Sequence, residues 1–230
     1  AVMALLSACV TTKTSPFDAN VSVDKEIESR IQVAIAYLQE NEPEQALAQM
    51  EIAIEKKPKS ARVHEILALS LARTGEFDLA EKHFKKMLKF DPKYTRGRSN
   101  YAGFLMSQDE YQEAKEQLLV VVDDIYYPNR AVAFWQLAFI SKSQEDDAAV
   151  EKYLLRAVGL DSRFAAAHLE LAELRFEQKQ YAESYKSLAR YRKNVKQSSA
   201  KSLLLGIKLA RIFKDKNEEA SFVLALKNLY

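Results

Sequence analysis

The chain has 230 residues, of which 48% are hydrophobic and 29% are charged, and its formal net charge is +2. This composition supports a substantial folded domain and argues against wholesale disorder, while so mild a charge gives no sign of a nucleic-acid-binding protein. The single cysteine excludes a disulfide within the chain, and only five glycines and five prolines favour long helices.

The first residues have the pattern of a secretion and anchoring signal. Residues 1–8 form an apolar run that ends in small residues, which is typical of the end of a signal peptide. The segment Leu6-Ser7-Ala8-Cys9 resembles the bacterial lipobox, in which the cysteine receives a diacylglycerol and further acyl chains such as palmitate. The alternative is an incidental cysteine after a chance apolar run. We expect covalent lipid on Cys9, no other cofactor and no metal.

Residues 9–25 are rich in Thr, Ser, Lys and Asp, and we expect them to form a polar tether between the lipid and the folded domain. In bacterial lipoproteins, an aspartate directly after the lipidated cysteine favours retention at the inner membrane. Here that residue is Val10. The resemblance therefore implies an outer-membrane lipoprotein that faces the periplasm.

An internal repeat organises the remaining chain. Between residues 61 and 94, apolar residues at helical spacing predict two helices, which a turn at Gly75 separates. Ala46, Ala80 and Ala114 follow one another at intervals of 34 residues, the period of a tetratricopeptide repeat. One such hairpin cannot bury its apolar face, whereas a stack of hairpins can.

The sequence therefore predicts an all-α fold, a right-handed α-solenoid of six tetratricopeptide helix-turn-helix repeats over residues 26–230. The first helix is expected to begin near Asp24, a plausible N-cap. The third repeat ends with its proline two residues late, at Pro128, which predicts a longer loop and a bend there. The six repeats are expected at 27–60, 61–94, 95–128, 131–164, 165–198 and 199–230.

The first helix of each repeat should present a second stripe of residues, at i, i+3, i+7 and i+10, to a concave inner surface. Two sections of this stripe are apolar and a middle section is basic. The apolar sections are either an exposed site for an amphipathic helix or extended segment, or core that neighbouring repeats cover. The basic section is either a carboxylate site or surface scatter. The candidate partner-binding residues are Ile31, Ile35, Leu38, Arg62, Leu69, Arg96, Met106, Trp135, Phe139, Leu169 and Phe176.

Catalytic chemistry has little support in the sequence. His64 and His168 occupy the same repeat position, where a packing residue is expected, and His83 lies among lysines. No zinc-protease motif, glycine-rich phosphate loop or serine–histidine–aspartate order is evident. We therefore expect a protein that is not an enzyme and that binds neither nucleic acid nor a small-molecule substrate.

Taken together, the lipobox, the tether and the six repeats resemble the PilF/PilW family of type IV pilus biogenesis lipoproteins, which are pilotins of the pilus secretin. Two segments carry the resemblance beyond the generic repeat, residues 127–131 (YPNRA) and residues 202–210 (SLLLGIKLA). The resemblance implies that the chain binds secretin subunits and promotes their localisation and multimerisation in the outer membrane.

Two other interpretations stay open at this point. The first is a different periplasmic repeat lipoprotein, either an adaptor for cell-wall hydrolases or an accessory of outer-membrane protein assembly. The second is an enzyme or nucleic-acid binder that carries a repeat domain. No residue pattern in the sequence supports this second interpretation.

Overall fold

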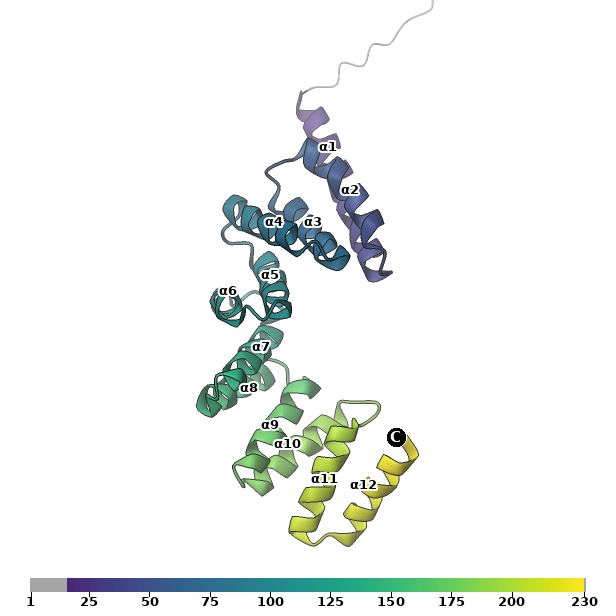
Figure 1. The fold of residues 1–230 in the computed structure, drawn as a ribbon, viewed down its shortest axis with the longest axis vertical. Coiled ribbons are helices and arrows are strands. Elements are labelled where there is room, and N and C mark those ends of the chain that lie inside the picture. Colours follow the sequence, from purple (N-terminus) through teal and green to yellow (C-terminus); the bar gives the residue numbers. More distant parts are fainter. Residues whose placement is uncertain (1–15, 230) are drawn as a thin grey trace, which may run out of the picture. The chain divides into compact units, whose positions relative to one another are not determined.

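The computed structural model describes residues 16–229, and within this range the chain forms twelve helices and no strand, which confirms the predicted all-α fold. Successive helices are joined as six helix–turn–helix pairs (Figure 1). The helices are α1 (Pro16–Gln39), α2 (Pro43–Lys56), α3 (Ala61–Thr74), α4 (Phe77–Phe90), α5 (Thr95–Ser107), α6 (Tyr111–Asp123), α7 (Arg130–Ser143), α8 (Asp147–Leu160), α9 (Ala165–Glu177), α10 (Tyr181–Lys193), α11 (Ala200–Phe213) and α12 (Lys216–Leu229).

The chain divides into two compact units, one up to Gly97 and one from Arg98 onward. In the first unit, α1, α2 and α3 enclose a core of buried aliphatic residues and alanines that includes Ile27, Ala34, Met50 and Val63. In the second unit, a core cluster is formed by α9, α10, α11 and α12 and includes Ala172, Leu188, Leu209 and Phe222. Small residues at these contacts let neighbouring helices approach closely, which is the role that the repeat assigns to its alanines.

The turn inside every pair has the same backbone geometry. One residue of each turn adopts a left-handed conformation, and the amide N–H of the next residue donates to the carbonyl five positions earlier, at 2.8 to 3.1 Å. This hydrogen bond is the signature of a Schellman C-cap, which satisfies carbonyls that the end of a helix leaves free. The left-handed residues are Asn41, Gly75, Asp109, Glu145, Lys179 and Lys214.

The connections between pairs explain where the repeat loses its strict period. The loops at 57–60, 91–94 and 161–164 have four residues each, whereas the loop at 124–129 has six. The longer loop predicted around Pro128 is therefore confirmed, although the division into two units falls at Gly97 and Arg98. Arg130 fixes the end of this loop, since its Nε donates to the carbonyl of Val122 at 2.9 Å. The loop at 194–199 also has six residues, which the sequence did not indicate.

The first helix begins earlier than predicted. It starts at Pro16 rather than near Asp24, so residues 16–25 belong to α1, and the prediction of a tether that reaches residue 25 is wrong for this part. Proline is favoured in the first turn of a helix because its missing N–H would have no partner there. The apolar face also continues upstream, since Val23 packs against the same core as Ile27 and Ile31.

Gly206 in α11 is required by a close approach to α12. A Cβ atom at this position would lie 2.5 to 2.7 Å from ring atoms of the buried Phe222. We expect Gly206→Ala to lower the free energy of unfolding by about 1–3 kcal/mol, because the ring must move within a packed core. Urea unfolding measures this change.

Gly103→Ala in α5 is the matched control, since no atom lies within 4 Å of its Cβ position, and alanine there should stabilise by about 0.5–1 kcal/mol. Equal losses of unfolding free energy in both variants would contradict the requirement for glycine at position 206.

Within the described range, no helix has the length and apolar content needed to cross a bilayer. The predicted lipid attachment at Cys9 and the signal-peptide remnant at 1–8 lie outside the described residues.

Candidate protein-binding groove

The clearest candidate site lies in the second unit, where α7, α9 and α11 line two adjoining hollows that share Lys142. The first hollow is small and lies over Trp135, Phe139 and Leu154. The second encloses about 290 Å³ over Phe176, Leu204 and Leu205. We call this surface the α7–α9–α11 groove, defined by Trp135, Phe139, Lys142, Phe176, Lys201, Leu204 and Lys208.

Ion pairs link neighbouring helices of the groove. Lys142 of α7 pairs with Glu170 of α9 at 3.4 Å, and Lys201 of α11 pairs with Glu173 of α9 at 2.7 Å. The hydrogen bond and the charge of Glu173 raise the pKa of Lys201, so this ammonium stays protonated at neutral pH.

Lys208 differs from these two lysines. Its Nζ lies 5.8 Å from the centre of the Phe176 ring, within the range of a cation–π contact. No carboxylate pairs with it among the residues that the structure describes. The groove therefore combines apolar side chains with the ammonium of Lys208 and the carboxylate of Glu177, both of which line the second hollow.

The candidates of the second unit differ in exposure, and only Trp135, Phe139 and Phe176 line the groove. The side chain of Phe139 is 48% exposed and lies open to a partner. Trp135 is partly buried, with the Phe164 ring edge-on at 6.0 Å. Leu169 and Phe176 are partly buried and pack against the core of the second unit. Met106, on α5, is partly buried and lines neither hollow.

The spacing i, i+3, i+7 and i+10, counted from Ala200, predicts Leu203 and Ile207 on the inner stripe of the last repeat, and it therefore misses Leu204 and Lys208. The structure buries Leu203 and Ile207, whereas Leu204 is 49% exposed. The cause is a one-residue shift, since α11 begins 35 residues after α9 rather than 34. The turn residues Lys179 and Lys214 show the same spacing, but the residues of the preceding loop carry no signal that would have revealed it.

In the first unit, the apolar candidates are mostly core. Ile31 is 2% exposed and belongs to the buried cluster, so its prediction as an exposed groove residue is wrong. Ile35, Leu38 and Leu69 are partly buried and pack against the same cluster. Packing by neighbouring repeats, the alternative considered for this section, accounts for these residues.

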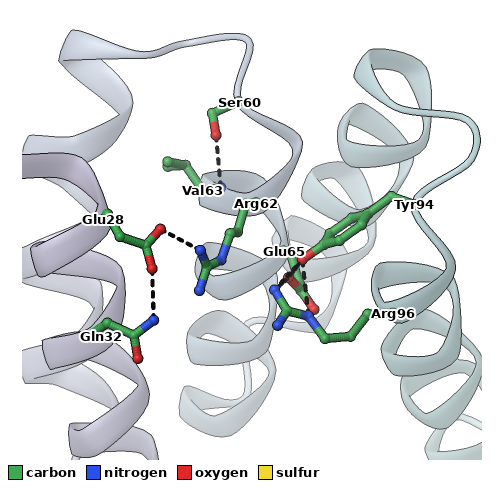
Figure 2. A network of polar contacts seen from close by, with 8 residues as sticks. All are labelled: Glu28, Gln32, Ser60, Arg62, Val63, Glu65, Tyr94 and Arg96. Carbon is green, nitrogen blue, oxygen red and sulfur yellow. Dashed lines mark hydrogen bonds and ion pairs between the residues drawn. The ribbon is translucent and has the colours of Figure 1, made fainter. Parts of the chain in front are cut away.

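The basic candidates of the first unit bind carboxylates of the chain itself (Figure 2). Arg62 of α3 pairs with Glu28 of α1, and Gln32 donates to the same carboxylate at 2.8 Å. The hydrogen bond from Gln32, together with that from Arg62, lowers the pKa of Glu28. Arg62 therefore links two successive repeats and offers little to an incoming carboxylate.

Arg96 has a similar internal role. It lies 3.4 Å from the carboxylate of Glu65, which is 1% exposed, and its Nε donates to the Tyr94 hydroxyl at 3.1 Å (Figure 2). Tyr94 in turn donates to Glu65. Burial, and then the charge of Glu65, raise the pKa of Tyr94 and keep its phenol protonated. A carboxylate site at these arginines is not favoured, because a buried acid needs such partners to remain charged.

The histidines pack as the sequence predicted. His64 is 2% exposed, its Nε2 lies 3.0 Å from the carbonyl of Pro58, and its Nδ1 lies 2.9 Å from Nδ1 of His83. Burial lowers the pKa of both rings, and that of His83 falls to about 4. In the described part of the chain, no group of three or more His, Cys, Asp or Glu residues gathers as a metal site.

This pair predicts a sensitivity to acid. An unfolded histidine binds a proton near pH 6.5, whereas folded His83 binds one only near pH 4. The unfolded state therefore binds more protons in this window, and the free energy of unfolding should fall as the pH drops from 6.5 to 4.

His83→Leu should destabilise by about 1–3 kcal/mol at pH 7, because it leaves Nδ1 of His64 unpaired. It should also flatten the pH dependence. Urea unfolding at pH 7, 6 and 5 tests both effects. If the free energy of unfolding fell with pH as steeply in the variant as in the wild type, the assignment of this pH dependence to His83 would be refuted.

The fold and the groove together define a tetratricopeptide-repeat protein, the class that binds other proteins on stacked helical hairpins. Models of the tetratricopeptide repeat match residues 33–95 and 71–125. The type IV pilus assembly protein PilF of Pseudomonas aeruginosa is 33% identical over 226 residues, which cover 98% of this chain and 89% of PilF. The chain therefore belongs to the PilF family of type IV pilus proteins.

Solved structures agree with this assignment. The structure of PilF from Pseudomonas aeruginosa matches with a TM-score of 0.85 and 32% identity, and covers 91% of this chain and 94% of that chain. The crystal structure of PilW, described as a widely conserved type IV pilus biogenesis factor, matches with a TM-score of 0.74 over 88% of this chain and 93% of its own. At 23% identity, the likeness to PilW shows the shared solenoid fold alone.

Proposed function

We propose that this chain is a pilotin of type IV pilus biogenesis, a non-enzymatic lipoprotein that binds subunits of the pilus secretin. In this proposal, lipid on Cys9 anchors the chain to the outer membrane on its periplasmic face, and the solenoid carries the subunits to the place where they form the ring. Membership of the PilF family supports a role in type IV pilus assembly.

The observation that carries the proposal is the α7–α9–α11 groove. Phe139 and Leu204 are about half exposed on one continuous surface, and each would gain apolar burial if a partner segment covered it. Burying half of a large apolar side chain contributes on the order of 1 kcal/mol. An amphipathic helix or an extended segment of secretin fits a surface of this kind.

A deletion strain complemented with tagged protein tests this function. We expect the tagged chain to recover secretin from membrane extracts, and secretin multimers to disappear in the deletion strain and return on complementation. Recovery of cell-wall hydrolases or of the outer-membrane assembly machinery, with normal secretin multimers in the deletion strain, would instead identify a different periplasmic adaptor.

The anchor is tested by Cys9→Ser. Each buried CH₂ of an acyl chain contributes about 0.8 kcal/mol to membrane binding, so loss of several chains removes stable attachment. We expect the variant to move from the outer-membrane fraction to the soluble periplasmic fraction, and secretin multimers to decline with it. Conservation of the wild-type fractionation would rule out lipidation as the anchor.

A further inference from the structure

Two histidines three repeats apart, His64 in α3 and His168 in α9, occupy the same position and make the same contact. Nε2 of His64 lies 3.0 Å from the carbonyl of Pro58, and Nε2 of His168 lies 3.0 Å from the carbonyl of Ser162. A carbonyl only accepts hydrogen bonds, so Nε2 carries the proton in each neutral ring. Nδ1 is therefore left with a lone pair in both.

The surroundings of this lone pair differ between the two repeats. In repeat two, Nδ1 of His64 meets His83 at 2.9 Å, and its ring stacks on Phe90 with centroids 5.3 Å apart. In repeat five the residues at these two positions are Ser187 and Asn194. His168 is 8% exposed, and its Nδ1 has no hydrogen-bond partner among the residues described.

A pocket lies where repeat five lacks the second histidine ring. It is an open hollow of about 310 Å³, close to the lower limit for small-ligand sites, and its size suits a single amino-acid residue. Its apolar wall comes from α8 and α9, its polar base contains His168, and its rim carries three cations. The lining residues are Leu155, Val158, Ser162, His168, Leu171, Arg175, Lys186, Ser187 and Arg190.

The charges at the rim leave one cation without a partner. Arg175 lies 3.4 Å from Glu151 and donates to the Ser187 hydroxyl at 3.0 Å. Lys186 pairs with Glu183 at 2.7 Å. The guanidinium of Arg190 makes no ion pair within the described range. The rim therefore favours a ligand with a single negative charge.

We propose that this pocket binds an acylated apolar amino acid through its free carboxylate, its amide N–H and its side chain. In this arrangement the carboxylate meets Arg190, the N–H donates to Nδ1 of His168, and the side chain covers the exposed surfaces of Leu155 and Val158. This group ends every protein chain that finishes in an apolar residue, and it also exists as a free small acid. The pocket uses a different face of α9 from the α7–α9–α11 groove, since His168, Leu171 and Arg175 are spaced apart from the groove residues Glu173 and Phe176 around the helix. The inference is therefore independent of secretin binding.

Titration of the purified protein with N-acetyl-leucine tests the pocket, with the ring resonances of His168 followed by NMR. We expect these resonances to shift and to saturate with a Kd on the order of 1 mM, as suits so small a ligand. N-acetyl-leucinamide, which lacks the carboxylate, should bind at least tenfold more weakly. The peptide acetyl-Gly-Ala-Leu separates the two sources. Binding at least tenfold tighter than that of N-acetyl-leucine identifies a chain end as the ligand, and equal binding identifies a free acid.

Variants make the test specific. Arg190→Gln should lower the affinity about tenfold, since it removes a charge-assisted hydrogen bond, whereas Lys193→Gln, an exposed cation on the same helix outside the pocket, should leave it unchanged. Ser187→His should abolish binding while the chain stays folded at the titration temperature, because it places beside His168 a second histidine ring like the one beside His64 in repeat two. Thermal unfolding is measured in parallel, since the variant also loses the hydrogen bond between Arg175 and Ser187. Equal binding of the amide, an equal effect of Lys193→Gln, or the absence of any shift at His168 would overturn the proposal.

Discussion

Phe84→Ala is expected to cost about 3–5 kcal/mol of unfolding free energy, because it empties the position of the largest fully buried side chain in the described chain. Phe84 lies on α4 with Ala80 and Met87, and all three are 0% exposed. In a repeat protein each pair of helices is stabilised mainly by its neighbours. The loss should therefore appear first as faster amide exchange in α3 and α4.

Urea unfolding together with hydrogen exchange measures this effect. Leu79→Ala is the matched control on the same helix, since that side chain is 43% exposed, and its truncation should lower stability by about 1 kcal/mol or less. If Phe84→Ala behaved like Leu79→Ala, the burial assigned to the α3–α4 pair would be wrong.

The second large effect is expected on partner binding. Truncation of two apolar anchors, Phe139→Ala with Leu204→Ala, should weaken binding to a purified periplasmic fragment of secretin by about thirtyfold, or about 2 kcal/mol. Both side chains are about half exposed, so their loss should cost the fold less than it costs binding, although the Phe139 ring also lies 6.1 Å from that of Tyr111. Trp135 is less suited to this test, because it is more buried than Phe139 and its truncation would remove more internal packing.

Calorimetric titration with parallel thermal unfolding separates the two quantities. Leu119→Ala serves as the control, since Leu119 is 42% exposed on α6 and outside the groove. An equal loss of affinity in the control, or a loss of stability that matches the loss of affinity in the double variant, would remove the groove as the binding surface.

The fold could be predicted from the sequence because the residue types that recur in each repeat are those required at the contacts between helices. Ala46, Ala80 and Ala114 are all 0% exposed, as close contacts between helices require. Gly75 marks a turn in the sequence, but Glu145, Lys179 and Lys214 take the same left-handed conformation without a residue type that favours it. Their positions follow from the period rather than from local propensity.

The candidate site was predicted only in part, for two physical reasons. The helical spacing of a stripe does not show whether a neighbouring helix covers it. Ile31 and Phe139 were therefore predicted alike, although Ile31 is buried and Phe139 is exposed. The partners of a charged side chain also come from other repeats. Arg62 and Arg96 were therefore read as available cations, whereas the acids that bind them, Glu28 and Glu65, lie about one repeat earlier.

Photocrosslinking in cells tests most directly the central claim, that the α7–α9–α11 groove binds secretin. A photoreactive phenylalanine analogue at position 139 should form an adduct with secretin on irradiation, and the same analogue at position 119 should not. A secretin adduct from position 119 alone, or adducts at position 139 that contain only other proteins, would contradict the account.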